Sequence, residues 1–283
     1  MKDGYLYANG LRFHYVEEGP AEGQLVVLLH GFPEFWYSWR HQLPVLAEHG
    51  FRVVAPDLRG YNLSDKPHGI ASYDLDVLAR DVVEIIAALG AERAVLVGHD
   101  WGGGVAWHTA ARYPERVSRL AVLACPHPET LARALRRNLR QLRRSWYMFF
   151  FQLPFLPERF MSGKRVTAGL QAMTVRPGTF SPEELERYAE AAERPGAMHA
   201  ALNYYRASMR RWSRFLREPS PLVRAPTLLI WGEQDRALGV ELTKGLEHHV
   251  SASWHVEVLP GVGHFVQQEA PEDVNRLLLE FLG

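Results

Sequence analysis

The sequence is poor in cysteine, since Cys125 is the only one among 283 residues. A single cysteine excludes an internal disulfide framework and any zinc site built from several thiolates. No apolar run approaches the ~20 residues that a membrane-spanning helix needs. Residues 1–5 lack the apolar segment of a signal peptide. We therefore expect a soluble, cytoplasmic protein without a bound metal.

The chain also lacks an excess of charge of either sign, because 32 Lys and Arg side chains balance 32 Asp and Glu side chains. A neutral total gives no reason to expect binding to nucleic acid. We expect neither a nucleic acid nor a membrane as partner, and the oligomeric state stays open between monomer and homodimer. The hydrophobic share of 47% is ordinary for a globular chain, and the length allows one large domain with an insertion.

Short apolar runs rich in β-branched residues recur along the chain and predict strands buried on both faces. They lie at 25–29, 53–55, 94–97, 120–123, 227–230 and 256–259. Helical patterns separate several of them, for example at 76–89 and 273–281. This alternation predicts an α/β fold with a mostly parallel central sheet and helices on both faces. Asn9-Gly10, between runs at 5–7 and 11–15, predicts a hairpin at the leading edge of that sheet.

The alternation stops near Pro128 and resumes at Leu222. We expect a helical cap domain at 129–219, inserted in a discontinuous core domain at 1–128 and 220–283. Sixteen Arg and one Lys against eight Glu give the insertion a net charge of +9, so the rest of the chain carries −9. Such a basic segment is explained by docking on an acidic core or, alternatively, by a cap that attracts anionic substrates.

The chemistry is expected at Gly98-His99-Asp100-Trp101-Gly102-Gly103, between a predicted strand and a predicted helix. This Gly-x-Asp-x-Gly pattern stands where hydrolases carry the Gly-x-Ser-x-Gly nucleophile elbow. Small residues are needed there because the strand turns directly into the helix. The backbone N–H groups of that helix start favour an anion. Asp100 is therefore our candidate nucleophile. The alternative is that Asp100 only caps the helix.

Two further loops at strand ends supply partners for Asp100. Asp235 follows the run at 227–230, and His264 follows the run at 256–259. We expect Asp235 to orient His264 and His264 to activate water, with Glu233 as the reserve acid. The backbone N–H groups of Phe32 and Trp101 would form an oxyanion hole.

These residues resemble the epoxide hydrolases of the α/β-hydrolase fold over essentially the whole chain. The resemblance rests on five motifs: His30-Gly31-Phe32-Pro33-Glu34, Trp36-Tyr37-Ser38-Trp39-Arg40, Asp57-Leu58-Arg59-Gly60-Tyr61, Ser64-Asp65-Lys66-Pro67 and Gly98 to Gly103. It is similar to the stand-alone bacterial enzymes and to the hydrolase domain of soluble epoxide hydrolases. Asn62 departs from the family, which usually has Gly there, and we expect it to reshape a surface turn.

The resemblance also implies two cap tyrosines that polarise the epoxide oxygen. The family's Tyr-x-x-x-Phe-Gln-x-Pro stretch gives Tyr147, and its Asn-aromatic-Tyr-Arg stretch gives Tyr205, with Tyr204 as the neighbour most easily confused with it. The resemblance implies hydrolysis of a small apolar epoxide to a vicinal diol, without a cofactor. Phe32, Trp101 and Phe151 are expected to line the pocket, and Met148, Phe149, Phe150 and Phe155 suggest that its lining is aromatic.

An aspartate nucleophile suits attack on a saturated carbon. Serine would form an ether there, which water does not cleave, whereas a carboxylate forms a hydrolysable ester. The chain has no Gly-x-Ser-x-Gly, so an esterase lacks its nucleophile. A haloalkane or haloacetate dehalogenase uses the same first step and remains the alternative. A non-catalytic, ligand-binding hydrolase fold is a more remote one.

Overall fold

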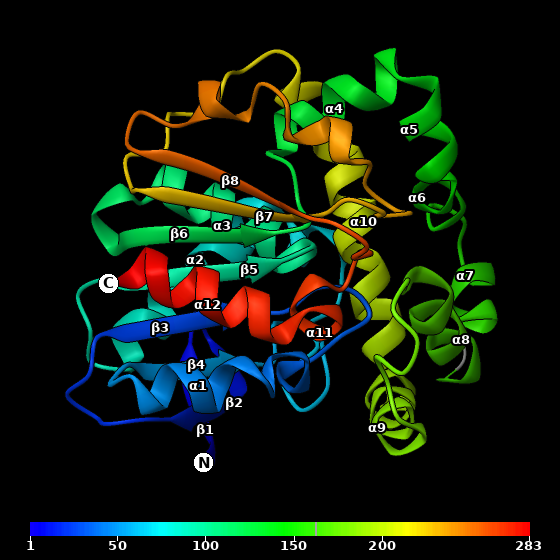
Figure 1. Ribbon diagram of the computed structural model, residues 1–283. Helices are drawn as coiled ribbons and strands as arrows, with labels where there is room; N and C mark the ends of the chain where they lie inside the picture. Colours follow the sequence, from blue (N-terminus) through cyan, green and yellow to red (C-terminus); the bar gives the residue numbers. More distant parts are fainter. Residues whose placement is uncertain (162) are drawn as a thin grey trace.

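The computed structural model, which describes residues 1–161 and 163–283, is built around an eight-stranded sheet (Figure 1). The strand order is β1-β2-β4-β3-β5-β6-β7-β8. Strand β2 pairs antiparallel with both β1 and β4, and every other neighbouring pair is parallel. The strands span β1 Lys2–Ala8, β2 Leu11–Glu18, β3 Leu25–Leu29, β4 Arg52–Pro56, β5 Ala94–His99, β6 Val117–Leu123, β7 Thr227–Gly232 and β8 Trp254–Leu259.

Helices cover both faces of this sheet, as the sequence predicts. Helices α1 (Gln42–Glu48) and α12 (Pro271–Leu282) pack on one face, and α2 (Leu75–Ala88) and α3 (Trp101–Arg112) pack on the other (Figure 1). Each face buries its own apolar cluster, because every residue of β3 and β5 is buried and successive side chains alternate between the two sides. The mostly parallel α/β prediction is confirmed.

Local signals in the sequence account for several element boundaries. Asn9 and Gly10 both have positive φ, of 47° and 74°, and close the predicted β1–β2 hairpin. The side chain of Asp74 accepts a hydrogen bond from the Asp76 N–H and caps α2. Helix α9 begins with a reciprocal capping box between Ser181 and Glu184.

Helices α4 to α10 fill the chain between β6 and β7 and lie beyond the carboxyl ends of the parallel strands (Figure 1). We call them the inserted helices. They have an apolar cluster of their own, which includes Phe35 and Phe265 from the core loops. The inserted helices span α4 Pro128–Arg137, α5 Leu139–Arg144, α6 Trp146–Phe150, α7 Leu156–Phe160, α8 Gly163–Met173, α9 Pro182–Glu193 and α10 Ala197–Phe215.

Ion pairs join the inserted helices to the acidic part of the chain. Arg211 of α10 contacts Asp74 and Asp76 at the start of α2. His108 also contacts Asp76, and these hydrogen bonds hold the pKa of the Asp76 carboxyl well below its usual range, despite partial burial. Part of the +9 charge is thus used for docking. Within the described residues, no helix has the length and apolarity needed to cross a membrane.

Candidate active site

Asp100 lies on the turn between β5 and α3 in a strained backbone conformation, with φ of 48° and ψ of −119°. The turn is possible only because its neighbours lack side chains. A Cβ added to Gly102 would lie 2.1 Å from the carbonyl oxygen of Leu29, and one added to Gly98 would lie 2.4 Å from the carbonyl oxygen of Gly102. The strain presents the Asp100 carboxylate at the carboxyl end of the sheet.

The two carboxylate oxygens of Asp100 have different surroundings. Oδ1 accepts a hydrogen bond from the Phe32 N–H at 2.9 Å, and Oδ2 lies 3.6 Å from Nε2 of His264. Burial opposes ionisation, but the hydrogen bond and charge of His264 and the Phe32 N–H outweigh it, so the pKa of Asp100 is lowered. Asp100 is therefore an anion at neutral pH.

His264 is held by Asp235, as the sequence predicts. Its Nδ1 lies 2.8 Å from Oδ2 of Asp235, whose Oδ1 accepts the N–H groups of Ala237 and Leu238. Burial disfavours the charged imidazole, yet Asp235 and Asp100 raise the pKa of His264 well above its usual value. Glu233 is exposed and accepts instead from the Gly261 N–H, so Asp235 is the acid that meets the histidine.

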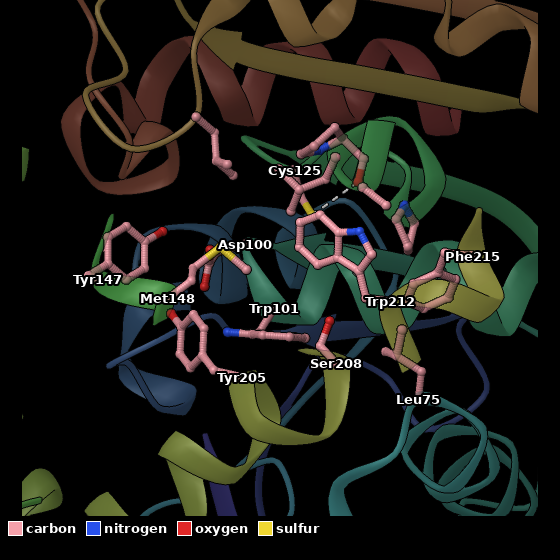
Figure 2. A pocket seen from close by; sticks show the side chains of 16 residues that line it. Leu75, Asp100, Trp101, Cys125, Tyr147, Met148, Tyr205, Ser208, Trp212 and Phe215 are labelled. Atoms are coloured by element: carbon pink, nitrogen blue, oxygen red, sulfur yellow. Dashed lines mark hydrogen bonds between the residues drawn. The ribbon is translucent and has the colours of Figure 1, made fainter. Parts of the chain in front are cut away.

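Tyr147 and Tyr205 reach the same pocket from α6 and α10. Both line it together with Asp100, and Figure 2 shows their hydroxyl groups pointing toward the Asp100 carboxylate. Their ring centroids are 5.9 Å apart and nearly perpendicular. Burial and the nearby Asp100 charge raise the pKa of Tyr147 and Tyr205 well above that of an ordinary tyrosine. Both phenols therefore keep their protons at neutral pH.

The neighbouring Tyr204 faces another way. Its hydroxyl donates to the Arg59 carbonyl at 2.7 Å, and its side chain is fully buried between α10 and the core. Adjacent residues of a helix point about 100° apart, which lets these two tyrosines meet different surroundings. The structure places Tyr205 in the pocket.

The pocket wall is mainly apolar, but the residues that form it differ in part from those predicted. Trp101 and Met148 line it, whereas Phe32 and Phe151 are not among its lining residues, and their rings pack edge-on against Tyr205. Nor do Phe149, Phe150 and Phe155 line it, and Phe149 and Phe155 are exposed to solvent instead. The further apolar lining residues are Leu75, Pro126, Pro128, Leu131, Ala132, Trp212, Phe215 and Leu238.

A buried pair behind the nucleophile was not singled out from the sequence. His99 Nδ1 lies 2.7 Å from Oε2 of Glu34, and its Nε2 lies 3.0 Å from the His264 carbonyl oxygen. A carbonyl only accepts, so Nε2 carries a proton and donates it. The pair ties the residue before Asp100 to the backbone of His264. Both residues stand within motifs of the sequence, but their pairing over 65 positions has no local signal.

Comparisons with known proteins identify the family of this chain. A family model described as alpha/beta hydrolase fold matches residues 24–271. The AB hydrolase superfamily protein YfhM of Bacillus subtilis is 40% identical over 100% of this chain and 98% of its own. Epoxide hydrolase 4 of Homo sapiens is 40% identical over 97% of this chain and 76% of its own.

A solved structure of an epoxide hydrolase is similar to this chain as well. A mutant epoxide hydrolase from Bacillus megaterium, crystallised with its product (R)-3-[1]naphthyloxy-propane-1,2-diol, superposes with a TM-score of 0.88. It is 36% identical and covers 99% of both chains. The chain belongs to the epoxide hydrolases of the α/β-hydrolase fold.

One residue of this epoxide hydrolase departs from the expected surface turn. Asn62 is buried, with φ of 39° in the left-handed region that Asn tolerates. Its side chain donates to Asp57 Oδ2 and accepts from Arg194 Nε, both at 2.7 Å. The expectation of a surface turn was wrong, because this side chain connects the core to the chain between α9 and α10.

One group of three potential metal ligands occurs among the described residues of the epoxide hydrolase: His127, Glu129 and His249. The two imidazole rings are stacked, with centroids 3.8 Å apart and planes 15° from parallel. A metal ion must lie close to the plane of each ring that it binds, and it cannot lie in two stacked planes at once. The arrangement as it stands does not fit a metal.

Proposed function

We propose that this epoxide hydrolase converts an epoxide and water to a vicinal diol through an ester on Asp100. The observation that carries the proposal is the convergence of three kinds of group on one pocket. A carboxylate of lowered pKa stands between two protonated phenols, Tyr147 and Tyr205, and an imidazole held by a buried carboxylate.

In the first step Asp100 would attack a ring carbon of the epoxide. Its Oδ1 is already held by the Phe32 N–H, so Oδ2 is the oxygen free to form the new bond. The ring C–O bond breaks, and its electron pair stays on the epoxide oxygen. Tyr147 or Tyr205 donates a hydrogen bond and then a proton to that oxygen, which stays attached as an alcohol. The phenols suit this role because their raised pKa keeps the proton available.

In the second step His264 would take a proton from water, which attacks the Asp100 ester carbonyl. Esterification removes the negative charge of Asp100, so the pKa of His264 falls and the imidazole becomes a usable base. The negative charge that develops on Oδ1 is stabilised by the Phe32 N–H and, as we infer, by the Trp101 N–H. Losing one such donor typically costs ~3 kcal/mol of transition-state stabilisation. The ester bond then breaks, and the departing alkoxide takes the proton held by His264 to complete the diol. The proton left on the Asp100 carboxyl group returns to the phenolate formed in the first step, which restores the enzyme.

The inserted helices would act as the cap domain of the enzyme, with the boundaries at 129 and 219. They supply Tyr147, Tyr205 and much of the apolar wall, so the cap determines which substituent the epoxide carries. The pocket has few polar groups away from Asp100. We therefore propose an epoxide with an apolar substituent as substrate.

The test is diol formation from styrene oxide or a stilbene oxide by the purified protein. Asp100→Asn removes the nucleophile and should nearly abolish turnover. Tyr205→Phe should lower it strongly, whereas its matched control Tyr204→Phe, whose hydroxyl bonds the Arg59 carbonyl outside the pocket, should retain most of it. Halide release from haloalkanes by a protein that is inert toward epoxides would overturn the proposal.

A further inference from the structure

Exposed apolar side chains gather on the inserted helices. Seven of the twelve large apolar side chains that are exposed in the described chain lie between positions 139 and 160. Trp146 is 62% exposed and Phe155 is 85% exposed. Scattered apolar residues are normal on a protein surface, but a contiguous group marks an interaction site. The Phe150 ring lies against those of both Trp146 and Phe160, which brings these exposed rings together. The seven are Leu139, Trp146, Phe149, Leu153, Phe155, Leu156 and Phe160.

The same stretch is strongly basic. From position 133 to 165 it contains eight Arg and one Lys, and Glu158 is the only acidic residue. Arg136, Arg137, Arg140 and Arg143 are exposed, and within residues 1–161 and 163–283 their side chains form no ion pair or hydrogen bond. We call these four arginines and the seven apolar residues the basic–aromatic face.

This face lies on the side of the molecule away from the sheet. Figure 1 shows α5, α6 and α7 along the right-hand edge, with α10 between them and the strands, whereas α4 lies at the top and also packs against α3. Helix α6 has two sides: Tyr147 and Met148 line the pocket, whereas Trp146 and Phe149 point to solvent. Trp146 and Phe149 are therefore separated from the active site by one short helix.

We propose that the basic–aromatic face binds the surface of an anionic lipid bilayer. Trp, Phe and Leu side chains enter the boundary between headgroups and acyl chains, and arginines pair with lipid phosphates. A single ligand of this kind matches both halves of the face. The contact is peripheral, so it is compatible with the lack of a membrane-crossing helix in the described chain.

Two other partners, a second copy of the chain and a nucleic acid, fit this face less well. A second copy docked face to face would bring two strongly basic surfaces together without an acidic partner. A nucleic acid would satisfy the arginines, but it offers little to the exposed aliphatic side chains of Leu139, Leu153 and Leu156. The inference revises the expectation of no membrane partner, which rested on the lack of an apolar run long enough to span a membrane. A peripheral contact needs no such run, and the net charge of +0 averages a basic segment with an acidic remainder.

The test is cosedimentation of the purified full chain with lipid vesicles. We expect binding to phosphatidylglycerol vesicles that weakens with added salt, and little binding to phosphatidylcholine vesicles. Leu139→Ser with Phe155→Ser should weaken binding about tenfold or more. Tyr7→Ser, at a 76% exposed aromatic on β1, is the matched apolar control and should change binding less than about twofold.

Charge is tested in the same assay. Arg140→Gln with Arg143→Gln should also weaken binding about tenfold or more, since each arginine at an anionic surface contributes roughly fivefold. Arg80→Gln with Arg276→Gln removes equal charge from exposed positions of the core and serves as control. Thermal unfolding verifies that each variant is folded.

Several outcomes would overturn the inference. One is failure of the wild-type protein to sediment with phosphatidylglycerol vesicles. Equal binding to phosphatidylcholine is another, and so is an equal loss in the control variants. A lipid-free dimer that Leu139→Ser with Phe155→Ser dissociates would assign the face to a second copy. Tighter binding to an RNA homopolymer than to vesicles would assign it to nucleic acid. None of these readouts depends on epoxide turnover, so the proposed function is tested separately.

Discussion

Replacement of His264 by Gln separates the two proposed steps. The imidazole has one contact toward each carboxylate, with Nδ1 2.8 Å from Asp235 and Nε2 3.6 Å from Asp100. Glutamine fills similar space and can donate to Asp100, but it cannot take a proton from water. The first step requires the Asp100 carboxylate and the two phenols, which all remain. The second step loses its general base.

The size of the effect follows from these roles. A positioned general base contributes typically ~10²–10⁴-fold to a rate, so ester hydrolysis should slow by about that factor. Alkylation should slow much less. Loss of the positive charge of His264 raises the pKa of Asp100, whereas the Phe32 N–H and the amide of the introduced glutamine still favour its carboxylate form. The ester should therefore accumulate to nearly one per enzyme molecule.

Intact-protein mass spectrometry after mixing with styrene oxide measures the ester. His264→Gln should gain the mass of one substrate molecule, located by peptide mapping on Asp100, and the added change Asp100→Asn should remove it. A single turnover of the wild-type enzyme in heavy-oxygen water should label the Asp100 carboxylate and not the diol. Diol formation by His264→Gln without any adduct, together with label in the wild-type diol, would refute the covalent mechanism.

Three further predictions follow from the site and the fold. Tyr147→Phe with Tyr205→Phe should lower kcat/KM for the diol by ~10²-fold or more, because the alkoxide loses its proton donors; half-normal activity would exclude their role. Turnover should fall as the pH drops through the pKa of His264 in the ester, since only neutral imidazole accepts a proton from water, and a pH–rate profile that rises toward acid would contradict this. Gly102→Ala places a methyl group against a backbone carbonyl of β3, so it should lower the free energy of unfolding by about 1–3 kcal/mol or more and lower Tm. The control is Gly104→Ala, where the nearest atom to an added Cβ is 3.9 Å away and Tm should stay nearly unchanged.

Some features of the site could not be predicted from the sequence because they depend on contacts between distant parts of the chain. The aromatic residues at 149–151 and 155, with Met148, predict an aromatic pocket, but only Met148 faces it, and Phe149 and Phe155 are exposed. Helix α6 has five residues, and its orientation depends on how it packs against α10 and the core loops. Composition does not determine that orientation. The pairing of His99 with Glu34 is likewise a tertiary contact.

The sequence by itself determined the α/β sheet, the β1–β2 hairpin and the elbow at Asp100. These depend on local requirements, namely buried strand patterns, an Asn-Gly turn and glycines where a Cβ would collide. It also determined the chain order of the candidate residues Asp100, Asp235 and His264. The family resemblance indicated Tyr205, but only the tertiary structure showed what Tyr204 does instead, namely donate to the Arg59 carbonyl outside the pocket. The tertiary structure also decided that the aromatic stretch of the inserted helices points partly to solvent. The reason is that a side chain's neighbours on a short helix are set by how that helix packs.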